Sequence, residues 1–285
     1  MIRNSLPLLL AAAAATASAQ SLDIQTSLEF DAYVLHEAVT LTVRLTALGS
    51  SPYIVDDYGE YTANTLQVVL RHETDGFQEP MRAGPPFGTV MARPGEPETL
   101  TCRLNEWFPL ARQGRYTVQV VARRGAESIA SPLLSFMVVG GLEISSETRL
   151  LPGEDHRSRR YTLLYWPRNQ REDLFLRIDD EQAGHVVALF RLGPVMRYEK
   201  PRIEFGANGE FSVVQQITRD RFLRTRFLSD ASAMKVLDRQ QLVDPNQSAI
   251  ARSLLESRER DSRGGAPLDG FRRRERGPKE TDSGR

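Results

Sequence analysis

The stretch LNEWFPLARQGRYTVQVV, residues 104–121, decides the fold class of the first half of this chain. After a glycine, Tyr116, Val118 and Val120 alternate with Thr117 and Gln119. Because successive side chains of a strand point to opposite faces, this alternation predicts a strand with one apolar face. A tyrosine just past a corner is typical of Greek-key sandwiches, where its hydroxyl bonds back to upstream backbone. We therefore expect a packing role for Tyr116 and for the aromatic rings before it.

The same alternation recurs on both sides of this corner, with turns rich in proline, glycine and serine between the segments. The segments read as strands are 28–36, 40–46, 53–55, 66–70, 99–104, 116–121 and 134–138. This spacing predicts an all-β fold that begins with an antiparallel β-sandwich over residues 20–140.

A second region is expected over residues 141–243, with Gly140-Gly141 as the hinge into it. Alternating apolar residues from Tyr161 to Val236 predict an antiparallel β-meander of about seven strands. Gly206-Ala207-Asn208-Gly209 is a strong turn signal within it. Several of these strands carry apolar residues on both faces, which predicts burial between layers or against the first domain.

Beyond residue 243 the composition changes, and Phe271 is the one aromatic residue left. A segment rich in Arg, Glu, Gly, Ser and Pro buries too little apolar surface to offset its chain entropy. We therefore expect residues 244–285 to be mostly disordered.

The amino terminus resembles a secretory signal peptide over residues 1–19. Arg3 supplies the positive start, Leu6–Ala15 the short apolar run, and Ala17-Ser18-Ala19 a cleavage site that leaves Gln20 first. The apolar run is too short to cross a bilayer as a helix, and no later stretch is long enough. We expect an exported protein, secreted or periplasmic, without a transmembrane segment.

The charge balance limits the partners that we expect, and the cysteine content limits the covalent cross-links. The chain has 37 Lys+Arg and 37 Asp+Glu, so no bulk attraction to nucleic acid is expected. Cys102 is the one cysteine, so no disulfide forms within the chain. It lies on the apolar face of its predicted strand, which indicates a small buried hydrophobe.

Four segments together carry a family resemblance: Glu37-Ala38-Val39, Ser50-Ser51-Pro52, Pro94-Gly95-Glu96 and Gly114-Arg115-Tyr116-Thr117-Val118. Their order resembles bacterial immunoglobulin-like domains, and is similar in layout to the bacillus intracellular proteinase inhibitor-type domain, over residues 28–139. The resemblance implies an immunoglobulin-like sandwich and makes protease inhibition an alternative function. The second half resembles no family that we can name.

No catalytic or metal-binding set emerges from the sequence. The four histidines are scattered, and no phosphate-binding glycine loop or nucleophile elbow is present. The acidic loops Asp56–Glu60 and Asp179–Glu181 carry the oxygen ligands that Ca²⁺ prefers. Their spacing does not match a dedicated calcium loop, so we interpret them as solvated turns. We predict a protein that is not an enzyme and needs no cofactor.

The leading functional hypothesis is an exported binding or structural protein whose partner is another protein or a component of the cell envelope. The long loop 77–93 is the expected contact, through Met81, Phe87 and Met91, because binding sites concentrate on long loops. Two alternatives stay open. One is the protease inhibitor, and the other is a carbohydrate-binding module that uses the aromatic residues Tyr165, Trp166 and Tyr198.

Overall fold

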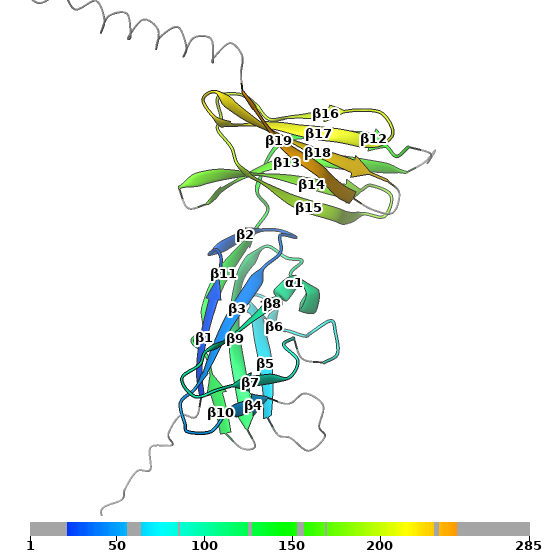
Figure 1. Ribbon diagram of the computed structural model, residues 1–285. Helices are drawn as coiled ribbons and strands as arrows, with labels where there is room; N and C mark the ends of the chain where they lie inside the picture. The colour runs from blue at the N-terminus through cyan, green and yellow to red at the C-terminus, as the bar shows by residue number, and fades with distance from the viewer. Residues whose placement is uncertain are drawn as a thin grey trace, which may run out of the picture.

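The computed structural model describes residues 22–55, 64–84, 86–124, 127–152, 157–168, 170–230 and 234–243. The predicted signal peptide 1–19 with cleavage near Ala19-Gln20, the acidic loop Asp56–Glu60 and the tail 244–285 lie outside these residues. Within them the fold is almost entirely antiparallel β, as predicted (Figure 1). No helix in this part of the chain is long and apolar enough to cross a membrane.

The first group of strands builds two sheets that share one core. One sheet has the order β1 (Leu22–Leu28), β3 (Thr40–Ala47), β8 (Glu98–Arg103). The other has the order β2 (Ala32–Val34), β11 (Leu134–Val139), β9 (Gly114–Arg124), β5 (Asn64–His72), β6 (Gly76–Gln78), and β10 (Glu127–Ala130) also pairs with β9. A small separate sheet joins β4 (Tyr53–Val55) to β7 (Val90–Ala92), and one helical turn, α1 (Leu104–Trp107), follows β8.

Apolar side chains at alternate positions of the strands fill the space between these two sheets. Leu41, Val43 and Leu45 of β3 are fully buried, and they share a core with Val118 and Val120 of β9. Burying a large aliphatic side chain contributes about 1.5–3 kcal/mol, so this core is the main source of stability. Cys102 lies in the same core, as predicted, and burial raises the pKa of its thiol to about 11.

The corner before β9 also has the predicted structure. The Tyr116 hydroxyl donates a hydrogen bond to the backbone carbonyl of Arg112 at 3.0 Å, and its ring stacks on Phe136. Gly114 precedes it with φ of +138°, and a Cβ there would lie 2.6 Å from Nε2 of the His72 ring. Only glycine therefore lets the chain enter β9 against that ring.

The start of the sandwich differs from the prediction of one strand over residues 28–36. The chain ends β1 at Leu28 and crosses to the other sheet, where β2 pairs in parallel with β11. Glu37 holds the return, because its Oε2 accepts a hydrogen bond from the Val34 amide at 2.8 Å. His36 has a positive φ of 74°, which closes the turn. Periodicity alone missed this crossing because Tyr33 and Val34 continue the apolar pattern.

The second group forms two four-stranded meanders. The first has the order β12 (Leu142–Leu150), β13 (Ser158–Arg168), β14 (Arg171–Asp180), β15 (His185–Pro194). The second has the order β16 (Arg202–Phe205), β17 (Glu210–Thr218), β18 (Arg221–Ser229), β19 (Met234–Val243). The sequence predicted about seven strands and omitted β12, whose residues are largely exposed and polar.

The two meanders pack face to face around one core. Tyr161 and Leu176 of the first sheet share that core with Phe211 and Phe227 of the second, and these two phenylalanine rings stack 4.9 Å apart. The predicted turn at 206–209 joins β16 to β17. Gly209 has φ of +79°, and a Cβ there would collide with the main-chain carbonyl of Ser229 in β18, the neighbouring strand of the same sheet.

Candidate binding site

A groove runs along the outer edge of β5 in the first sandwich. Its volume is about 490 Å³. The lining residues are Thr65, Leu66, Gln67, Val68, Val69, Leu70, Phe77, Gln78, Pro80, Gly84, Pro86, Trp107 and Phe108. They come from β5, from β6, from the loop that follows β6, and from α1 with the residue after it. Most of them are apolar, and Phe77 is 65 % exposed with the Arg71 guanidinium 4.5 Å from its ring centroid.

The main chain of β5 is paired on both sides for only part of its length. β9 pairs with β5 from Asn64 to His72, whereas β6 pairs only with Leu70–His72 on the other side. Among the described residues, Thr65–Val69 therefore have a strand neighbour on one side only. The groove follows this half-paired stretch.

Two hydrogen bonds show which backbone groups of β5 point into the groove. The Glu73 amide donates to the Arg115 carbonyl at 3.0 Å, and the Val120 carbonyl accepts from Ser131 on the opposite side of β9. In an antiparallel pair, residues that bond to the neighbour alternate with residues whose N–H and C=O point away from it. The backbone groups of Leu66 and Val68 therefore point away from β9 and into the groove.

A proline explains why β6 does not continue alongside residues 65–69 of β5. Pro80 comes two residues after the end of β6, and proline has no N–H to continue a ladder. The loop instead crosses to α1, where the Met81 amide donates to the Trp107 carbonyl at 2.7 Å. Within the described part of the chain this edge of β5 is therefore open, and the loop and α1 form the far wall of the groove.

The structure separates the three predicted contact residues. Met81 is 57 % exposed beside the groove, and Phe87 packs against the core of the sandwich. Met91 lies on β7, 47 % exposed and opposite Ile54 of β4, where it lines a different hollow of about 350 Å³. Residues 77–93 are also not one loop, since the end of β6 and all of β7 fall within them.

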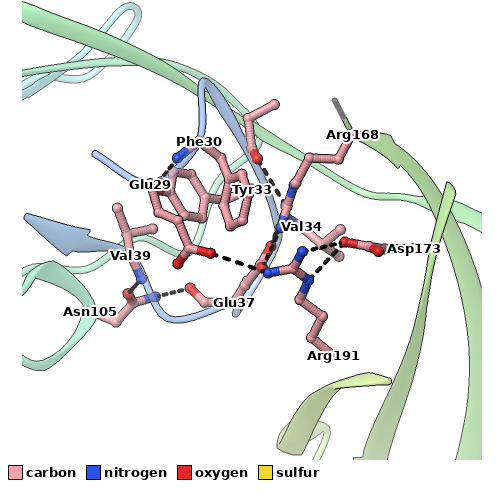
Figure 2. A network of polar contacts seen from close by, with 11 residues as sticks. Glu29, Phe30, Tyr33, Val34, Glu37, Val39, Asn105, Arg168, Asp173 and Arg191 are labelled. Atoms are coloured by element: carbon pink, nitrogen blue, oxygen red, sulfur yellow. Dashed lines mark hydrogen bonds and ion pairs between the residues drawn. The ribbon is translucent and has the colours of Figure 1, made fainter. Parts of the chain in front are cut away.

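A polar contact, separate from the groove, joins the two sandwiches (Figure 2). Arg168, at the end of β13, donates two hydrogen bonds to the Glu37 carboxylate at 2.8 and 2.7 Å and a third to the Ala32 carbonyl at 2.9 Å. The exposed fractions of the two side chains are 2 % for Arg168 and 10 % for Glu37. Burial opposes the charge on Arg168, but the hydrogen bonds and charge of Glu37 raise its pKa overall.

Phe30 lies between two arginines at this contact. The Arg168 guanidinium is 3.9 Å and the Arg191 guanidinium 4.6 Å from the centroid of its ring, close enough for cation–π attraction. Arg191 also pairs with Asp173 of the neighbouring strand at 2.7 Å. Apolar contact continues beside them, where Val34 of the first sandwich joins Leu164 and Phe175 of the second.

The sequence did not point to this contact. Glu37 entered the sequence analysis only in the segment Glu37-Ala38-Val39, and Arg168 did not enter it. The available signal was the apolar residues on the second face of several strands, Leu164 of β13 among them, which the sequence analysis assigned to packing between layers or against the first domain. The structure places Leu164 and Phe175 of that face against the first sandwich.

The aromatic residues of the carbohydrate hypothesis do not form one platform. Tyr165 is buried with the Arg197 guanidinium 5.1 Å from its ring centroid, and Trp166 packs at the contact between sandwiches. Tyr198 is 73 % exposed and lines a hollow of about 620 Å³ with Arg171 and other residues.

The predicted acidic loop Asp179–Glu181 is not a loop throughout, because Asp179 and Asp180 end strand β14, and its carboxylates pair with arginines. Asp180 accepts hydrogen bonds from the Ala183 amide at 3.0 Å and from Arg157 at 2.8 Å, and these bonds lower the pKa of its carboxyl group. Asp179 pairs with Arg177, and Glu181 with Arg160. Among the residues that the structure describes, no group of three potential ligands is placed to hold a metal ion.

Comparisons with known proteins show neither the family nor the function of this chain. No protein-family model matches the chain, and no curated protein matches it. A search of solved structures finds the crystal structure of Spo0M, a sporulation control protein from Bacillus subtilis, at 13 % identity and a TM-score of 0.28. The match covers 85 % of this chain and 98 % of that one.

Proposed function

We propose that this chain is an exported protein without catalytic activity that holds a partner protein or envelope component in the groove beside β5. The observation that carries the proposal is an apolar groove beside a stretch of β5 that, among the described residues, pairs with a strand on one side only. Exposed apolar surface next to such an edge favours association with another chain.

Affinity capture from the cell envelope tests this function. The purified full chain serves as bait beside two variants with the same chemical change, Gln67→Lys in the groove and Gln25→Lys on β1. Both glutamines are exposed on strands, so neither change is expected to unfold the chain. We expect a co-purifying partner with the parent chain and with Gln25→Lys, and about tenfold less with Gln67→Lys.

A second pair of variants separates the groove from exposed apolar surface in general. Phe77 lines the groove, whereas Met91 is exposed on β7 outside it. Phe77→Ala is expected to reduce capture and Met91→Ala to leave it unchanged. Equal effects of the two alanine variants, or no difference between the two lysine variants, would remove the groove from the function.

We also propose that the first sandwich is immunoglobulin-like. The Tyr116 hydroxyl bond to the Arg112 carbonyl supports it, because a tyrosine at this corner is a hallmark of such sandwiches. The inhibitor alternative rests on that likeness, and an assay of the full chain against serine and cysteine proteases tests it. The carbohydrate alternative rests on Tyr198 in its hollow, and loss of glycan binding in Tyr198→Ala tests it.

A further inference from the structure

The edge of β5 offers the hydrogen-bonding pattern of an unfinished sheet. Leu66 and Val68 direct both N–H and C=O into the groove, as the bonds of Glu73 and Val120 on either side of β9 require. Polar backbone groups at a sheet edge template the pairing of a further strand. Small apolar ligands do not provide the alternating donors and acceptors that these groups need.

The shape of the groove agrees with an occupant that lies along the edge rather than over one face. Its lining includes Leu66 and Val68, whose side chains point into the core, and also Thr65, Gln67 and Val69 from the opposite face of β5. Both faces of one strand line the same groove only where the groove runs beside that strand. An added strand in this position would bring its own alternate side chains to both faces.

The open stretch is also uncharged, unlike the outermost strands of the second sandwich. The outermost strand β12 carries Glu143, Glu147 and Arg149, and the outermost strand β19 carries Lys235, Asp238 and Arg239. Charged side chains on edge strands protect proteins against unwanted strand pairing. Thr65–Val69 lack this protection. At about 3.4 Å per residue the stretch is about 17 Å long, enough for a short peptide segment.

We propose that the occupant of the groove is an extended, uncharged segment of a partner protein that adds to β5 as a strand, bonding to Leu66 and Val68. This inference rests on the proposed function and names the chemistry of its partner. Main-chain bonds supply the affinity, and the apolar lining at Pro86, Trp107 and Phe108 selects apolar side chains at alternate positions.

Synthetic peptides added to the full chain test strand addition. The probe is a capped peptide of about eight residues that alternates valine and threonine, with a lysine at each end for solubility. Two further versions carry N-methyl groups on alternate residues, one on the valines and the other on the threonines. Because only every second residue of an added strand bonds to its neighbour, one methylated version should lose affinity by about tenfold or more and the other should bind as the parent does.

Hydrogen exchange reports where the peptide binds. Bound peptide should slow exchange at the Leu66 and Val68 amides and leave Gln25 on β1 unchanged. Equal binding of both methylated versions would overturn strand addition. Strand addition would also be overturned if the Leu66 and Val68 amides stayed unprotected both in the presence of the peptide and in the presence of any partner captured from the envelope.

The outcomes separate this inference from the function on which it rests. If capture depends on Gln67 but both amides stay unprotected, the groove is a binding site and its occupant is not an added strand. A small apolar ligand or a helix in the groove would give this result. Protected amides with no capture from the envelope support strand addition and contradict the proposed envelope partner.

Discussion

Replacement of Glu37 by glutamine is the sharpest perturbation of the contact between the two sandwiches. The Glu37 carboxylate accepts hydrogen bonds from both terminal nitrogens of Arg168, at 2.8 and 2.7 Å, and it accepts another from the Val34 amide. Glutamine keeps the size of the side chain but removes its charge and one of its two acceptors. The Arg168 guanidinium, 2 % exposed, is then left without its counter-charge.

The structure sets the size of the expected effect. Hydrogen bonds to charged groups contribute about 1.5–3 kcal/mol each, and breaking a buried ion pair on one side costs about 3–5 kcal/mol in total. Arg168 retains the Ala32 carbonyl and the Phe30 ring, which offset part of the loss. We therefore expect Glu37→Gln to lower the free energy of unfolding by about 3 kcal/mol.

Urea denaturation of the full chain measures this loss, and two further variants locate its cause. Glu106→Gln is the matched control, since Glu106 pairs with Arg103 at the surface and should lose less than about 1 kcal/mol. Arg168→Met in the Glu37→Gln background removes the unpaired charge and should recover part of the stability. If Glu37→Gln costs no more than Glu106→Gln, the buried pair does not hold the sandwiches together.

Three further predictions concern single residues outside the contact between the sandwiches. Tyr116→Phe should lower the free energy of unfolding by about 1 kcal/mol because the corner hydrogen bond is lost, whereas Tyr198→Phe at the surface should change nothing measurable in the same urea titration. With its pKa raised to about 11, the Cys102 thiol should react with iodoacetamide near pH 8 about a hundredfold more slowly in the native chain than in the unfolded one, and equal rates would contradict its burial. Gly184→Ala should cost about 1–2 kcal/mol from its positive φ alone, and Gly209→Ala should cost clearly more because its Cβ also meets backbone; thermal unfolding that ranks them the other way would refute this packing.

Much of the first sandwich could be predicted because its core follows a period of two. Leu41, Val43 and Leu45 point inward as their alternation indicates, and the hydroxyl of Tyr116 bonds to upstream backbone as its position after a corner indicates. Local pattern failed where the chain changes sheet. Tyr33 continues the apolar pattern after Leu28, so the crossing from β1 to β2 left no trace in the alternation.

The candidate site could be predicted only in part. The loop after β6 was expected to bind, and its prolines do help to form the groove, but Met91 lies elsewhere. The open edge at Leu66 and Val68 depends on which strands pair with β5, and that follows from long-range contacts rather than from local sequence. The ion pair of Glu37 and Arg168 joins residues 131 positions apart, beyond the reach of any local motif.

Amide hydrogen exchange in the free full chain tests the central claim most directly, because the claim is that one edge of β5 is open. The account predicts an alternating pattern, with fast exchange at Leu66 and Val68 and slow exchange at Gln67 and Val69, whose amides bond to β9. Slow exchange at all four amides would show that another part of the chain already occupies the edge, and would contradict the account.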